Sequence, residues 1–141
     1  MDDVHKPLGL HHIGIAVPSI RDALPHWTEG LGLTLHAVDD VPAEGVRVAV
    51  LMCGTTRIEL VEPMGPDSPV AKFLQKRGPG VHHLAFHVRD GQQKIDQLAA
   101  AGAPMLSKAP GPGAHDCKVA FVHPKYLHGV MAELVEDPHH E

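Results

Sequence analysis

A duplicated stretch constrains the fold of this chain more than any other feature of its sequence. Residues 9–17 read Gly-Leu-His-His-Ile-Gly-Ile-Ala-Val, and residues 80–88 read Gly-Val-His-His-Leu-Ala-Phe-His-Val. These two stretches lie 71 positions apart, and segments 47–50 and 118–121 have the same spacing, whereas the matching segments 59–62 and 133–136 lie 74 positions apart. Near-constant spacing of three matching segments indicates duplication of one supersecondary unit rather than a long array of repeats.

Each copy of the stretch alternates between two kinds of side chain, as a strand does. Successive strand residues point to opposite faces, so His83, Ala85 and His87 share one face while large apolar residues occupy the other. In the first copy, the face of His12 carries small residues such as Gly14. Small neighbours leave space above an imidazole, so we expect this face to line a cavity and the apolar face to be covered by a helix.

By the same alternation, His11 and His82 belong to the helix-covered faces of their strands. We therefore expect both of these histidines to be structural. His123 and His128 lie near a turn, and their roles stay open at the level of the sequence.

Turn and capping residues predict the rest of the fold. Ser19, Ser68 and Asp90 each precede a helical pattern and are good N-cap residues. Pro25 falls inside the first of these helices, which should be irregular there. The expected elements are strand 9–17, helix 19–31, strands 33–37, 46–52 and 57–61, helix 69–77, strand 80–88, helix 91–101, and strands 105–107, 117–123 and 130–135, with loops at 39–45 and 109–116.

This order predicts one α+β domain, residues 1–141, made of two tandem βαβββ modules. The first module spans residues 8–63 and the second spans residues 80–136, and residues 64–79 form a linker that contains a helix.

Composition excludes several classes of protein. The formal charge of −5 argues against a nucleic-acid-binding protein, and no apolar run approaches the roughly 20 residues that cross a bilayer. The N-terminal residues lack the basic and apolar regions of a signal peptide. Two cysteines, Cys53 and Cys117, do not make a disulfide framework. We therefore expect a cytoplasmic protein with reduced thiols.

Two glutamates occupy matching places in the last strand of each module. Glu59 and Glu133 are flanked by aliphatic residues, where a lone carboxylate is costly to bury unless it is paired, protonated or metal-bound. A single histidine at a strand start is usually structural. Duplication, however, brings His12, His83 and the two glutamates to one place, if a pseudo-two-fold axis relates the modules. Imidazole suits Zn²⁺, Co²⁺, Ni²⁺ and Fe²⁺, and carboxylates suit harder ions such as Mn²⁺. The sequence therefore predicts a divalent metal site.

With these positions, the chain resembles the vicinal oxygen chelate superfamily, which includes glyoxalases, and within it the methylmalonyl-CoA epimerase family. The matching segments are 11–17, 58–63, 67–74, 80–83, 123–125 and 129–134. They extend over nearly the whole chain. The Ser-Pro start of the linker helix and the His-Pro-Lys turn at 123–125 are the more specific marks of the epimerases.

The resemblance implies a cupped mixed sheet around a divalent metal ion, with His12, His83 and Glu133 as ligands and Glu59 at a position that holds glutamine or glutamate in the family. Co²⁺ is the expected ion, with Mn²⁺, Zn²⁺ or Ni²⁺ as alternatives. The implied reaction interconverts (R)- and (S)-methylmalonyl-CoA by removing and returning the C2 proton. A homodimer is also implied, and no nucleic acid or membrane is an expected partner.

Under this hypothesis, Glu133 is the first catalytic base, and Glu59 is its partner on the opposite side of the substrate. Some members of the family carry a glutamate, proposed as a catalytic base, where this chain has Val48. Glu44 is a further candidate for the second acid or base.

The resemblance also suggests residues that contact the substrate. Small Ala85 would leave room for the acyl group, and His87 shares the face that points to it. Lys108, Lys118 and Lys125 are candidates for the CoA phosphates, although exposed lysines are usually only solvated.

Two alternatives remain at this point. One is glyoxalase I, which would use the same metal geometry on a glutathione hemithioacetal. The linker helix and the His-Pro-Lys turn argue against it. The other is a metal-free module that sequesters a drug in an aromatic cleft. A chain with one Trp, one Tyr and three Phe is poorly equipped for that role.

Overall fold

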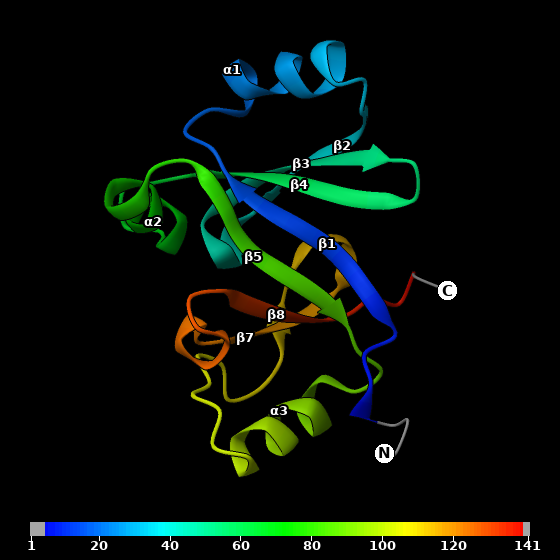
Figure 1. Ribbon diagram of the computed structural model, residues 1–141, viewed down its shortest axis with the longest axis vertical. Helices are drawn as coiled ribbons and strands as arrows, with labels where there is room; N and C mark the ends of the chain where they lie inside the picture. Colours follow the sequence, from blue (N-terminus) through cyan, green and yellow to red (C-terminus); the bar gives the residue numbers. More distant parts are fainter. Residues whose placement is uncertain (1–4, 140–141) are drawn as a thin grey trace. The chain divides into compact units, whose positions relative to one another are not determined.

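The computed structural model describes residues 5–139 (Figure 1). The chain divides into two compact units, a first unit of residues 12–82 and a second unit of residues 1–11 and 83–141. On both occasions the chain crosses between the units inside a strand, at His11–His12 and at His82–His83. The two His-His pairs of the sequence therefore mark the boundaries of the units.

The first unit is a mixed four-stranded arrangement with strand order β2-β3-β4-β1. Strands β1 and β4 are parallel, and the other neighbours are antiparallel. Its elements are β1 (Gly9–Ala16), α1 (Ile20–Pro25), η2 (His26–Gly30), β2 (Thr34–Val41), η3 (Pro42–Glu44), β3 (Val46–Cys53), β4 (Thr56–Pro63) and α2 (Pro69–Arg77).

Helix α1 begins and ends where local chemistry requires it. The Ser19 hydroxyl accepts a hydrogen bond from the Asp22 N–H at 3.1 Å, and Glu62 Oε1 accepts one from the Ile20 N–H at 2.8 Å. Regular helix ends at Pro25, which has no N–H to donate, and the chain continues as the π-helical turn η2. This outcome confirms the predicted cap and the predicted irregularity.

The second unit has the strand order β5-β8-β7-β6, with β5 and β8 parallel. Its elements are β5 (Gly80–His87), α3 (Gly91–Ala100), β6 (Gly111–Pro112), η4 (Ala114–Asp116), β7 (Lys118–Val122), η5 (Pro124–Leu127) and β8 (Met131–Glu136). The N-cap predictions are confirmed for α3, where Asp90 accepts from the Gln93 N–H at 3.0 Å, and for α2, where Ser68 accepts from the Ala71 N–H at 3.1 Å.

Each unit buries an apolar cluster on the face of its strands that a helix covers. In the first unit, Leu60 and Ile20 belong to a cluster against which Trp27 packs, and in the second, Leu134 belongs to one with Ile95 of α3. Full burial of such aliphatic side chains stabilises a fold by about 1.5–3 kcal/mol each. The predicted division of each strand into a helix face and an opposite face is confirmed for Glu59 and Leu60, because Leu60 joins the cluster and Glu59 does not.

Two predicted loops contain strand instead. Strand β2 continues through Val41, where the sequence predicts a loop from residue 39, because Asp39 and Asp40 pair with Val48 and Arg47 of β3. The Arg47 Nε–H also donates to Asp40 Oδ1 at 2.8 Å. In the loop predicted at 109–116, β6 pairs with β7. The short strand predicted at 105–107 is reduced to an isolated bridge between Met105 and Val122.

The element order confirms the predicted α+β class and its repeated β-α-β-β-β pattern, with β6 as a two-residue remnant of one strand. Among the residues that the structure describes, no helix is long and apolar enough to span a membrane.

Candidate functional site

The first unit contains a buried pair of a histidine and a glutamate. His12 lies on β1 and Glu59 on the parallel neighbour β4, and His12 Nδ1 lies 3.4 Å from Glu59 Oε2. The two side chains are 6% and 11% exposed. Arg57 lies on the same face of β4, and its guanidinium Nη1 is 4.0 Å from Glu59 Oε2. The carboxylate is therefore held between an imidazole and a cation.

The second unit contains the matching pair. His83 lies on β5 and Glu133 on the parallel neighbour β8, and His83 Nε2 lies 2.9 Å from Glu133 Oε1. Both side chains are nearly inaccessible, at 7% and 6% exposed. This distance is that of a hydrogen bond, so the imidazole orients the carboxylate directly.

The two pairs have the same strand register. In the first unit, Gly14, two residues after the histidine, is opposite Glu59 in the parallel ladder. In the second unit, Ala85, again two residues after the histidine, is opposite Glu133. In both units, therefore, the histidine lies on the same face of its strand as the residue opposite the glutamate, two positions before it. The structure thus brings together His12 with Glu59 and His83 with Glu133.

Each pair offers an imidazole nitrogen and a carboxylate oxygen in a buried setting. These are donors that first-row divalent metals prefer, and metal binding would offset the cost of burying the carboxylate. The donor chemistry of both units therefore fits a divalent metal ion.

Other predicted contact residues have different surroundings. Ala85 is fully buried and packs in a cluster with Cys117, Val119 and Val135. His87 is buried, and its ring meets that of His11 edge-on with centroids 6.1 Å apart.

Residues of the predicted His-Pro-Lys turn shape the backbone. Lys125 is exposed, and its N–H donates to His123 Nδ1 at 3.0 Å, so His123 caps the turn η5. His128 ends this turn in the left-handed conformation, with φ 59°. The structure therefore gives these two histidines a structural place that the sequence left open.

The helix-covered face of His11 stays a prediction, because the contacts that the structure gives for this residue are with Asp137 and His87. His11 Nε2 lies 2.7 Å from Asp137 Oδ2, and its ring meets the His87 ring edge-on. His82 does pack against a helix, because its ring meets Phe73 of α2 edge-on with centroids 4.9 Å apart. Asp137 was missed because it follows the last strand and matches no motif. Arg57 was missed as a neighbour of Glu59, although it lies two residues away on one face.

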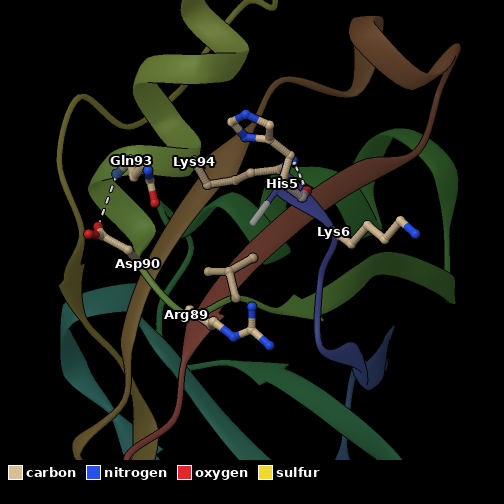
Figure 2. Close-up of a pocket in the computed structure, with 7 residues that line it drawn as sticks. His5, Lys6, Arg89, Asp90, Gln93 and Lys94 are labelled. Carbon is tan, nitrogen blue, oxygen red and sulfur yellow. Dashed lines mark hydrogen bonds between the residues drawn. The ribbon is translucent and has the colours of Figure 1, made fainter. Parts of the chain in front are cut away.

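A hollow lies at the start of α3, and none of its lining residues is a predicted site residue (Figure 2). Its empty space, open solvent included, is about 270 Å³. The lining residues are His5, Lys6, Val88, Arg89, Asp90, Gln93 and Lys94. The Lys94 ammonium is already engaged there, because it donates to the carbonyl oxygen of His5 and to Gln97, both at 2.8 Å.

Comparison with known proteins defines the class. The family model of the Glyoxalase/Bleomycin resistance protein/Dioxygenase superfamily matches residues 11–121, and the chain belongs to this superfamily. Ethylmalonyl-CoA/methylmalonyl-CoA epimerase of Cereibacter sphaeroides is 40% identical over 89% of this chain and 95% of its own length.

Among solved structures, the chain is similar to methylmalonyl-CoA epimerases. A methylmalonyl-CoA epimerase in complex with methylmalonyl-CoA and NH4+ is 31% identical, with TM-score 0.89 over 95% of this chain and 97% of that one. A variant of Streptomyces coelicolor methylmalonyl-CoA epimerase in complex with 2-nitronate-propionyl-CoA is also 31% identical, with TM-score 0.91 over 96% of this chain and 99% of that one. These matches confirm the resemblance to methylmalonyl-CoA epimerase and the predicted fold.

Proposed function

We propose that this chain is a methylmalonyl-CoA epimerase that removes the C2 proton of the substrate on one face and returns a proton on the other. The observation that carries the proposal is the buried His–Glu pair repeated in the same register in both units. The relatives support the substrate, because they include epimerases of methylmalonyl-CoA at 31–40% identity over most of the chain.

The proposed metal site combines His12 and Glu59 of the first unit with His83 and Glu133 of the second. A bound divalent ion would act as a Lewis acid toward the thioester carbonyl and carboxylate oxygens of the substrate, which makes the C2 proton easier to remove. Co²⁺ is the proposed ion, with Mn²⁺, Zn²⁺ or Ni²⁺ as alternatives.

Glu133 is the proposed first base. Its carboxylate is buried and is oriented by the His83 imidazole at 2.9 Å, and a general base needs such a fixed position within reach of the proton. Glu59 is the proposed acid for the opposite face, with Glu44 as the substitute.

The substrate contacts are part of the same proposal. Ala85 has only a methyl side chain, which would leave room for the acyl group. His87, two residues further along the same strand, is the other proposed contact with the substrate. Exposed Lys125 is the proposed partner for a CoA phosphate. A homodimer in the cytoplasm completes the proposal.

Proton exchange tests this function directly. Methylmalonyl-CoA in deuterated water is incubated with Co²⁺-loaded protein and with chelator-stripped protein, and the C2 proton signal is followed by NMR. We expect metal-dependent loss of that signal well above background. Absence of exchange with both samples would refute the epimerase, and activity on methylglyoxal with glutathione would then identify a glyoxalase.

A further inference from the structure

A second group of metal-binding side chains lies within the second unit, apart from the His83–Glu133 pair. His11, Cys117 and Asp137 each present a ligand atom, and these three atoms lie within 4.8 Å of one another. They come from three separate places in the chain: β1, the residue before β7, and the residue after β8. The grouping is therefore made by the fold and does not follow from a local sequence motif.

All three residues are largely withdrawn from solvent. His11 and Cys117 are 7% and 8% exposed, and the side chain of Asp137 is also 7% exposed. The orientation of the carboxylate is fixed on both sides, because Asp137 Oδ2 lies 2.7 Å from His11 Nε2 and Asp137 Oδ1 accepts a hydrogen bond from the His139 N–H at 2.9 Å. Ordered donors of this kind lose little conformational entropy when they bind an ion.

A second imidazole borders this group without belonging to it. The His87 ring is buried and meets the His11 ring edge-on, with centroids 6.1 Å apart. Two imidazoles, a thiol and a carboxylate thus gather in one buried region of the second unit.

The chemistry of this set is selective. Thiolate, imidazole and carboxylate are the three ligand types of protein zinc sites, which are nearly always tetrahedral. Zn–N distances of about 2.0–2.1 Å and Zn–S distances of about 2.3 Å place neighbouring ligand atoms roughly 3.3–3.8 Å apart. On binding, the 2.7 Å separation of His11 Nε2 and Asp137 Oδ2 would open to such a value, while the other separations already lie within 4.8 Å. Hard ions that prefer oxygen, such as Mg²⁺, have no reason to choose a site with a thiol.

We propose that His11, Cys117 and Asp137 bind a Zn²⁺ ion, with water in the fourth position of the tetrahedron. On binding, the ion replaces the proton shared by His11 and Asp137 and the proton of the Cys117 thiol, and both protons leave to solvent. The site ties the residue after β8 to β1 and to the start of β7. It is separate from the proposed catalytic metal, and only the count of two ions per chain in the test below rests on the proposed function.

Cobalt titration of the chelator-stripped full chain tests the proposal, because Co²⁺ reports a thiolate ligand through near-ultraviolet charge-transfer absorption. The His/Glu set has no sulfur, so this absorption distinguishes the two sites. We expect the wild type to bind two ions per chain and to show the thiolate absorption. Cys117→Ser should bind one ion and lose the absorption. Cys53→Ser, which removes the exposed thiol, is the matched control and should retain both properties.

Two further variants keep the test decisive if Cys117→Ser fails to fold. Asp137→Asn should weaken Co²⁺ binding at the thiolate site by at least about tenfold, since it removes a ligand charge. Glu133→Gln should leave the thiolate absorption unchanged. The proposal is overturned if saturating Co²⁺ gives no thiolate absorption, or if the absorption persists in Cys117→Ser.

Discussion

The His–Glu pair of the first unit and that of the second have the same register but different neighbours. Glu59 lies 3.4 Å from its histidine and 4.0 Å from the Arg57 guanidinium. Glu133 lies 2.9 Å from its histidine, and the residue two positions before it, which matches Arg57, is the uncharged Met131. Glu59 therefore has both a cation and an imidazole nearby. Glu133 has an imidazole nearby, and the residue that matches the arginine is an uncharged methionine.

The difference teaches how a duplicated site can divide two tasks. A nearby cation favours the charged form of a carboxylate and opposes its protonation. Beside that cation, Glu59 gives up a proton more readily, which suits the proposed acid, while Glu133, without an arginine at the matching position, is better suited to accept one. This asymmetry supports Glu133 as the first base, and each of the following experiments tests one part of it.

The largest effect is expected for Glu133→Gln. The amide keeps the size of the side chain but cannot accept the C2 proton, and loss of a general base costs about 10²–10⁴-fold in rate. We expect C2 proton exchange to fall by that factor, measured by NMR, with an unchanged circular dichroism spectrum. Retention of full activity in a folded variant would exclude Glu133 as the base.

Replacing the matching core leucine of either unit by alanine should have a comparably large effect, on the free energy of unfolding. Leu60 and Leu134 are 0% and 5% exposed, and each belongs to the helix-covered cluster of its unit. Leu→Ala in such a core costs about 2–5 kcal/mol. Leu60→Ala should cost at least as much as Leu134→Ala, because Leu60 is more completely enclosed. Urea unfolding of both variants measures the two values, and a reversed order would contradict this reasoning.

A smaller effect is expected for Glu59→Gln. The amide oxygen of glutamine can still bind a metal ion, and the resemblance places glutamine or glutamate at this position. If Glu59 acts mainly as a ligand, exchange should fall by less than about tenfold. A fall in the exchange rate as large as that of Glu133→Gln would instead show that Glu59 is an essential acid or base. The same NMR assay on both variants separates these roles.

Much of the fold and of each His–Glu pair could be predicted from the sequence, because both depend on local periodicity. Alternation along the strands placed His12 and Glu59 on one side, and capping residues such as Ser19 located the helix starts. The hydrogen bond between His11 and Asp137 could not be predicted, since it joins residues 126 positions apart that match no repeat. Strand β2 was underestimated because Asp39 resembles a turn residue, yet it pairs with Val48 of β3.

The smallest effect is expected for Arg57→Met, which gives the first unit the residue that the second unit has at Met131. Removal of a cation 4.0 Å from Glu59 leaves that carboxylate more attractive to a second cation. Because Arg57 is 26% exposed, solvent screens much of its charge, so the change should be modest. We expect Co²⁺ to bind about two- to fivefold more tightly at the His/Glu site. Titration in the Cys117→Ser background isolates that site, and Arg47→Met, at an arginine paired with Asp40 on β2, is the matched control. Weaker binding in Arg57→Met would mean that the arginine orients Glu59, and that its charge is secondary.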